Sequence, residues 1–461
     1  MPLSFEWLIA PIEPAAFFET YYERQPLLIE RQSPARFEAL LSMAAIDKFL
    51  ATTSPRHPDV FLVDAARSLN GDDYTISNLG DGSLDLARVY ELFGTGATIS
   101  IRHLHESMPE LAALCRSVEK VFSGHFQTNI YLSPPNAQGF GTHFDSHDVF
   151  VLQVAGSKVW TLNDTLIELP LHAQGFDKEK HIPGPVMREF TIRAGDLFYC
   201  PRGLFHAARS TDEISLHITL GLIGKTWADV MMEAVSAACL ASPAFRANLP
   251  VGFANADFDA AQAETQFRAL IESFARSAEL APVLERFVQD FVTSRRPDLS
   301  GMLQQAGEVP LITPATQVEA RPHLVYRLRP DGEQIALMFG SSTITFPAFV
   351  REALEFALRG APLAVRDLPG GLDDAGKVVL VRRLVKEGLL LASNKVSAPA
   401  VVAPSVRQRS VQRARPKRAS RRLDTHGSPV KCRRRYSTME HAHDTQSQSQ
   451  GRKSTADAFR F

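Results

Sequence analysis

The sequence predicts an α+β protein with a sandwich or jelly-roll core, flanking helices and a small winged-helix unit ahead of a basic tail. Three observations carry this prediction. Short β-rich runs follow one another through the middle third at intervals of roughly 8–12 residues. Apolar residues then recur at helical spacing over residues 224–300. From residue 396 the composition turns rich in Arg, Ser and Gln.

The overall composition is that of a globular protein. With 461 residues, and about 100–200 residues per domain, the chain should hold two to four domains. Its 45% hydrophobic and 22% charged residues exclude a wholly disordered, collagen-like or coiled-coil chain. No run approaches the roughly 18 apolar residues of a membrane helix. Four scattered cysteines and an N-terminus without a basic signal region indicate a cytoplasmic protein with no membrane contact.

The β-rich runs of the middle third are separated by Gly, Pro, Asp and Asn. This alternation of short strands and turns is typical of a sandwich or jelly roll. Residues 35–125 carry weaker signals, and we expect them to complete the barrel and its flanking helices. The predicted strands are 128–132, 149–154, 159–162, 189–192, 197–200 and 214–222.

Residues 224–300 are predicted to be helical. Their apolar side chains share one helix face, so an αα-hairpin should pack against the body or against a second copy. The residues of this face include Trp227, Val230, Met231, Ala234, Val235 and Ala238.

Residues 320–395 resemble a small winged helix. Two strands, 323–328 and 335–339, flank a turn at 330–332, and two helical stretches follow. Winged helices often read DNA with their last helix. Here that helix has a mixed surface, which favours packing or protein docking over DNA reading. Its charged residues are Lys377, Arg382, Arg383, Lys386, Asp373, Asp374 and Glu387.

The tail, 396–461, has a net charge of +11, against −12 for residues 1–395. It lacks the apolar mass that offsets ordering entropy, so we expect disorder. A basic arm for RNA is one interpretation, and a solvated extension without a selected role is the other.

A candidate metal site lies among the predicted strands. His143 and Asp145 are two residues apart, so on an extended strand both point to the same face. A second imidazole, His206, follows in the run Pro-Arg-Gly-Leu-Phe-His. Two histidines and one carboxylate hold Fe(II) on one side and leave positions open for substrate and oxygen. His-x-Asp alone is a weak signal, but this combination predicts a metal site.

A cation and two neutral side chains lie near this motif. Lys158 follows a turn and could project its ammonium into the barrel, where burial would demand an anion such as a dicarboxylic keto acid. Ser215 and Asn129 could complete the hydrogen bonds of that anion. The alternative is a solvent-facing lysine and ordinary strand polarity.

Four segments resemble the JmjC-type cupins of the ribosomal oxygenase family. They are Thr-Asn-Ile-Tyr-Leu-Ser-Pro at 128–134, Gly-Thr-His-Phe-Asp at 141–145, the run 148–160 from Asp-Val-Phe to Lys-Val-Trp, and Ser-Leu-His-Ile-Thr-Leu at 215–220. Residues 21–29 match as well. The resemblance extends in outline over 5–395 and excludes the tail. It implies a double-stranded β-helix (cupin) core and an Fe(II)- and 2-oxoglutarate-dependent protein hydroxylase.

The resemblance also assigns roles residue by residue. His143, Asp145 and His206 match the catalytic metal ligands. Lys158 matches the basic residue that pairs with the far carboxylate of 2-oxoglutarate. Asn129, Tyr131 and Ser215 match the polar neighbours of that carboxylate. His147 departs from the pattern, in which an aromatic residue such as Tyr is common, and could alter the choice of substrate side chain.

The same resemblance implies a division of the chain and a homodimer. An N-terminal α/β segment, 1–95, would flank the JmjC cupin core of 96–223. A helical dimerisation segment, 224–305, a winged-helix domain, 306–395, and the tail, 396–461, would follow.

The implied reaction uses Fe(II), 2-oxoglutarate and O2 to hydroxylate a His or Arg side chain of a ribosomal protein. The acidic body suits a basic partner of this kind. Lysine demethylation by the same chemistry is an alternative within the enzyme class. A nonenzymatic interaction module that works through the winged helix and tail is the alternative outside it.

Overall fold

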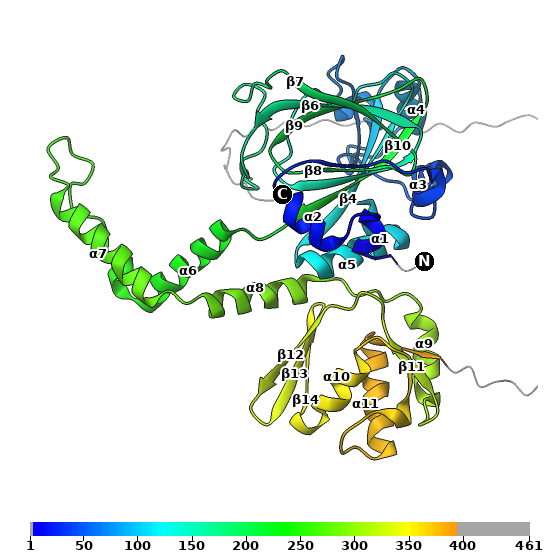
Figure 1. Cartoon of the computed structure of the whole chain (residues 1–461), viewed down its shortest axis with the longest axis vertical. Coiled ribbons are helices and arrows are strands. Elements are labelled where there is room, and N and C mark those ends of the chain that lie inside the picture. The colour runs from blue at the N-terminus through cyan, green and yellow to red at the C-terminus, as the bar shows by residue number, and fades with distance from the viewer. Residues whose placement is uncertain (1–2, 394–461) are drawn as a thin grey trace, which may run out of the picture. The chain divides into compact units, whose positions relative to one another are not determined.

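The computed structural model describes residues 3–393, so the tail and the expectation of disorder there lie outside the described residues. A seven-stranded sheet forms the larger layer of the N-terminal part, in the order β1–β8–β5–β10–β4–β3–β2, with all neighbours antiparallel (Figure 1). Its strands are β1 (Leu27–Ile29), β2 (Val60–Val63), β3 (Thr98–Arg102), β4 (His125–Ser133), β5 (Asp148–Ala155), β8 (Leu197–Cys200) and β10 (Ser215–Ile223).

A smaller antiparallel sheet faces it, in the order β7–β6–β9 (Figure 1). The strands are β6 (Ser157–Leu166), β7 (Val186–Arg193) and β9 (Leu204–Ser210). An isolated antiparallel bridge between His143 and His206 continues this sheet beyond β9. Each of the six β-rich runs expected from the sequence overlaps one observed strand.

Both faces of the larger sheet are covered, which explains why its inner strand β5 is buried almost throughout. Val149 and Val151 pack toward Trp160 and Leu162 of the smaller sheet. Phe150 lies on the opposite face, in a core shared with helices that flank the sheet. The helices of this part are α1 (Phe5–Ile9), α2 (Pro14–Thr20), α3 (Met43–Thr52), α4 (Leu86–Gly94) and α5 (Pro109–Phe122).

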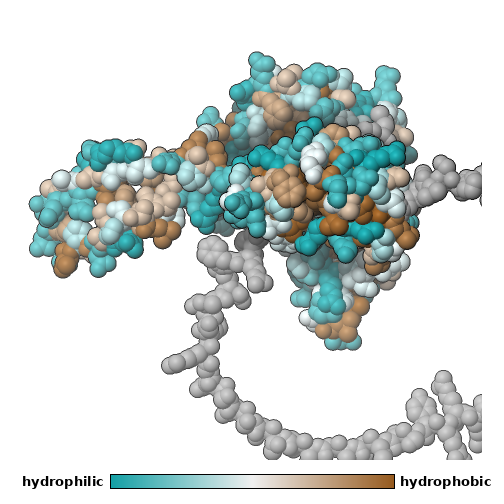
Figure 2. Space-filling model, turned by 90° about the horizontal axis from the view of Figure 1, so that it is seen from below, coloured by the Kyte–Doolittle hydropathy of each residue, from teal (hydrophilic) through white to brown (hydrophobic). Residues whose placement is uncertain are grey.

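Three helices follow the last strand of the larger sheet: α6 (Trp227–Ala241), α7 (Ala261–Ser277) and α8 (Leu280–Ser294). Neither α6 nor α7 has a buried residue. Trp227, Met232 and Phe267 are 73%, 63% and 59% exposed. Figure 2 shows brown, apolar patches among polar ones over this helical segment. Of the apolar face expected from the sequence, Trp227, Met231 and Val235 are therefore exposed within one chain, while Val230, Ala234 and Ala238 are half-buried.

The C-terminal part of the described chain has its own core, which includes Leu337, Leu354, Leu384 and Leu390. Two three-stranded sheets, β15–β11–β16 and β12–β13–β14, surround it together with three helices. No helix within residues 3–393 is long and apolar enough to cross a membrane. The elements are α9 (Met302–Glu308), β11 (Gln317–Ala320), β12 (Tyr326–Asp331), β13 (Gln334–Phe339), β14 (Ser342–Pro347), α10 (Arg351–Ala357), β15 (Leu363–Ala364), α11 (Asp374–Lys386) and β16 (Leu390–Ser393).

Candidate metal centre

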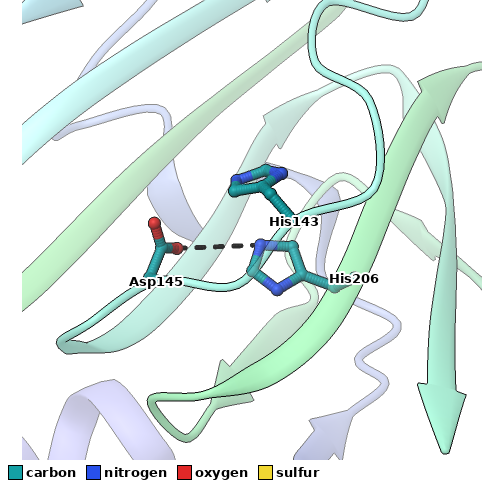
Figure 3. A group of neighbouring side chains, drawn as sticks. All are labelled: His143, Asp145 and His206. Carbon is teal, nitrogen blue, oxygen red and sulfur yellow. Dashed lines mark ion pairs between the residues drawn. The ribbon is translucent and has the colours of Figure 1, made fainter. Parts of the chain in front are cut away.

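His143, Asp145 and His206 come together, as Figure 3 shows. One possible ligand atom from each of the three side chains lies within 4.8 Å of the other two. Nε2 of His206 is 3.7 Å from Oδ2 of Asp145. The first two residues lie in the loop that leads into β5, and the third lies on β9. Folding therefore brings His206 beside Asp145, which is 61 positions away in the sequence, and beside His143.

Backbone carbonyl groups orient both imidazoles. Nδ1 of His143 lies 2.9 Å from the carbonyl oxygen of Gly141, and Nδ1 of His206 lies 2.9 Å from that of Leu204. A carbonyl oxygen only accepts hydrogen bonds, so each Nδ1 carries the proton. The lone pair of each Nε2 is then available to a metal, the usual arrangement for a ligating histidine.

The protonation states also suit a metal. Burial and the charge of His143 lower the pKa of His206 to about 4, so this imidazole is neutral near pH 7. Its contact with Asp145 is then not an ion pair. Burial favours the neutral form of Asp145, but the neighbouring imidazoles of His147, His206 and His143, which become cations as the pH falls, outweigh it and hold the pKa of this carboxyl below its usual value. Neutral imidazoles and a carboxylate are the forms that bind metal ions.

A glycine shapes the turn before His206. Gly203 has a φ of +84°, and a Cβ built there would lie 1.8 Å from the carbonyl oxygen of Ile167. Its N–H donates to the carbonyl oxygen of Asp145 at 2.8 Å. The turn therefore needs glycine, and it ties the loop of the carboxylate to the strand of the second histidine.

Lys158, on β6, lines the cavity beside these three residues and is only 4% exposed. Within residues 3–393 no carboxylate forms an ion pair with its ammonium. Burial lowers the pKa of Lys158 to about 7. A buried cation without a counter-ion is costly, so the cavity suits an anionic ligand.

The three proposed polar neighbours of that ligand are placed differently. Tyr131 lines the cavity, and its ring stacks on His217 with centroids 5.0 Å apart. Burial and the charge of Asp145 raise its pKa, so it stays a phenol that can donate a hydrogen bond. Asn129 and Ser215 are absent from the residues that line this cavity. The hydroxyl of Ser215 is buried and accepts a hydrogen bond of 2.8 Å from the Gln153 amide.

Further residues that the sequence reasoning gave no role also line the cavity, among them Trp160, His217 and Thr219. The period of two along a strand could have indicated them, because residues two apart share a face of the sheet: Trp160 follows Lys158 by two positions, and Thr219 follows His217 by two. His147 is close enough for its charge to act on Asp145, but its side chain is placed outside the cavity wall. Its ring contacts Gly221, where a built Cβ would come within 2.7 Å of it, and it does not line the cavity.

Comparisons with known proteins agree with this geometry. Residues 103–230 match the JmjC domain family. Ribosomal oxygenase 1 of Rattus norvegicus is 29% identical, over 84% of this chain and 72% of that one. Ribosomal oxygenase 1 of Homo sapiens is 30% identical over 64% of this chain, which spans only 48% of the human protein.

Two further relatives bear on chemistry and fold. A protein of Drosophila sechellia named bifunctional lysine-specific demethylase and histidyl-hydroxylase NO66 is 32% identical, over 47% of this chain and 33% of that one. The solved structure of E. coli ycfD matches with a TM-score of 0.50 and 15% identity, over 83% of this chain and 98% of that one. The latter likeness supports the mixed helix-and-sheet, cupin-like fold.

Proposed function

Because this chain carries a JmjC domain and belongs to the ribosomal oxygenase family, we propose that it is an Fe(II)- and 2-oxoglutarate-dependent dioxygenase that hydroxylates a protein side chain. One observation carries the proposal. Two imidazoles and a carboxylate present donor atoms within 4.8 Å of one another beside a cavity that also holds a buried lysine.

His143, Asp145 and His206 are the proposed ligands of the iron, and their donor set fits that metal. Iron bound there supplies the activation of O2, one atom of which converts 2-oxoglutarate to succinate and CO2 while the other enters a substrate C–H bond. The carbonyl groups of Gly141 and Leu204 hold the two imidazoles in the ligating tautomer.

The proposed role of Lys158 is to pair with the far carboxylate of 2-oxoglutarate. Its burial and its lack of a carboxylate partner within residues 3–393 support this role. We keep Tyr131, Asn129 and Ser215 as proposed neighbours of the same ligand, and Tyr131 has the strongest support because it lines the cavity. Val149, Val151 and Trp160 form apolar walls that exclude water from the reacting groups.

The proposed substrate is a His or Arg side chain of a ribosomal protein. The names of the mammalian relatives point to the ribosome, and the name of the insect relative includes histidine hydroxylation. The net charge of −12 over residues 1–395 suits a basic partner. A ribosomal substrate would place the protein in the cytoplasm.

Lysine demethylation is the second candidate, because the insect name includes it as well. Hydroxylation of an N-methyl carbon gives a hemiaminal that releases formaldehyde, so one site can perform both reactions. Mass spectrometry after incubation with ribosomal proteins separates them. One added oxygen atom on a product supports hydroxylation, and loss of a methyl group with release of formaldehyde supports demethylation. Turnover of neither kind would favour the interaction module.

We also propose that α6 and α7 form the dimer interface and that residues 306–395 are a winged helix used for packing. The uncovered apolar side chains of α6 and α7 support the first. Two basic side chains of α11 that bind backbone carbonyl groups support the second. Lys377 donates to Arg366 at 2.7 Å, and Arg382 donates to Ile312 at 2.9 Å. Nucleic-acid binding by the tail, 396–461, remains a proposal from its charge of +11.

A further inference from the structure

A buried ionic network lies behind the proposed metal ligands and does not line the cavity. Nη1 of Arg202 bridges two carboxylates: it lies 3.0 Å from Oδ2 of Asp148 and 2.5 Å from Oε1 of Glu23. The other oxygen of Asp148 accepts a hydrogen bond of 2.6 Å from the hydroxyl of Tyr199. That hydroxyl in turn accepts the backbone N–H of Glu23 at 2.9 Å.

The network joins three segments that are distant in the sequence. Asp148 opens β5, three residues after the ligand Asp145. Arg202 lies in the turn before β9, four residues ahead of the ligand His206. Glu23 belongs to the N-terminal segment that precedes β1. The same arginine therefore holds both ligand-bearing loops against the N-terminal segment.

Burial makes these contacts strong. The side chains of Asp148 and Arg202 are 2% and 13% exposed, and that of Glu23 is 34% exposed. A buried charge that loses its partner is strongly unfavourable, so the three groups hold one another in place. The Gly203 N–H, next to Arg202, binds the Asp145 carbonyl oxygen at 2.8 Å and adds a backbone tie between the same two loops.

We infer that Glu23, Asp148 and Arg202 form a clamp that fixes the separation of Asp145 and His206, with Arg202 as its positioning residue. The inference rests on the proposed metal centre. The clamp acts through the backbone, because the carboxylate of Asp145 lies three residues from Asp148 and the ring of His206 lies four residues from Arg202. Partners that orient metal ligands typically alter metal affinity by about 10–100-fold when they are removed.

The test compares metal affinity and unfolding temperature in full-length variants. Arg202→Lys keeps the charge but replaces the guanidinium, whose Nη1 contacts both carboxylates, by an ammonium on a shorter side chain. Co(II) is the probe, titrated by calorimetry and by its visible absorption, whose bands report the ligand geometry. We expect Arg202→Lys to weaken Co(II) binding about 10–100-fold and to change these bands. Glu23→Gln, at the more exposed end of the clamp, provides a second variant should Arg202→Lys fail to fold.

Two other arginines provide matched controls. Arg295 forms an ion pair with Glu119, buried like the clamp but remote from the ligands, with side chains 11% and 7% exposed. Arg295→Lys should lower the unfolding temperature and leave Co(II) binding unchanged. Arg209, on β9 beside the site, pairs with Glu189 in solvent, and Arg209→Lys should change neither quantity.

The outcomes separate the clamp from the metal centre. Clamp variants that lose thermal stability but bind Co(II) like the unaltered protein, with the same absorption bands, would overturn the positioning role and leave the proposed function intact. An unaltered protein that binds no Co(II) would contradict the metal centre itself, and with it any role for the clamp in metal binding.

Discussion

His143 and His206 lie directly opposite each other across an antiparallel bridge. The N–H of His143 donates to the carbonyl oxygen of His206 at 3.0 Å, and the reverse bond is 2.8 Å. Side chains of such a pair leave the sheet on the same face, and the ring centroids are 4.6 Å apart. The backbone therefore positions both imidazoles for one ion, and metal binding needs little further ordering.

Removal of one ligand should abolish metal binding without unfolding the chain. Asp145 lies in a loop and its side chain is 30% exposed, so Asp145→Ala leaves little buried space unfilled. We expect metal affinity to fall by more than the roughly 10–100-fold typical of residues that only support a ligand. Metal content tests whether binding is lost, and the unfolding temperature of the same sample tests whether the fold is retained. Full metal occupancy in Asp145→Ala would contradict the proposed ligand set.

Lys158→Ala should mainly raise the concentration of 2-oxoglutarate needed for turnover. A hydrogen bond to a charged group contributes about 1.5–3 kcal/mol, so we expect the apparent KM for 2-oxoglutarate to rise about 10–100-fold. Metal affinity should not change, because Lys158 is not a ligand. Steady-state succinate formation at varied 2-oxoglutarate measures this, and an unchanged KM would remove Lys158 from the site.

Binding of 2-oxoglutarate should also depend on pH through Lys158. Its pKa is lowered to about 7 by burial in the free protein, and a bound carboxylate would raise it. Only the ammonium attracts the ligand, so affinity should be greatest below pH 7. Above pH 7 the affinity for 2-oxoglutarate should decrease, with a slope that approaches about tenfold per pH unit. In this range Lys158 takes up a proton when the ligand binds. Calorimetry in buffers of different ionisation enthalpy measures that proton, which Lys158→Ala should not take up.

Much of the core and part of the donor set could be predicted from sequence, because both depend on local patterns. Short alternating runs mark strands wherever turn residues separate them, and His143 and Asp145 share a face through their spacing of two. The partnership of His143 with His206 could not be derived this way, because it depends on a bridge between distant segments.

Gly203→Ala tests the turn that presents His206. A methyl group there would overlap the carbonyl oxygen of Ile167, at 1.8 Å, in a backbone conformation with φ of +84°. Strain of this kind costs about 1–3 kcal/mol, so we expect a lower unfolding temperature and weaker metal binding. Gly175→Ala is the matched control, since nothing lies within 4 Å of a Cβ built there. Equal behaviour of the two variants would show that the turn tolerates a side chain.

A charge on the uncovered face of α6 should prevent self-association. Met232 is 63% exposed on a helix without buried residues, so a second copy could cover it at no cost to the fold of one chain. We expect Met232→Glu to shift the mass measured by light scattering from dimer to monomer. Leu303→Glu, at a site on α9 that is 97% exposed, should leave the mass unchanged. A monomeric unaltered protein would contradict the proposed interface.

The parts that sequence could not supply are those set by tertiary contacts. The pattern suggested Ser215 and Asn129 as ligand neighbours, which stays a prediction: neither lines the cavity and the Ser215 hydroxyl accepts a hydrogen bond from Gln153, whereas Trp160 and Thr219 form part of the wall. The clamp was invisible for the same reason, because Glu23 is 179 positions from Arg202. Charged residues on separate loops carry no periodic signal that predicts their pairing.

Succinate formation tests the central claim most directly. Purified protein is incubated in air with Fe(II), ascorbate and 2-oxoglutarate, with and without ribosomal proteins, beside His206→Ala. We predict succinate that increases with the ribosomal proteins and disappears in the variant. Absence of succinate under both conditions, from protein shown to hold iron at this site, would contradict the oxygenase assignment.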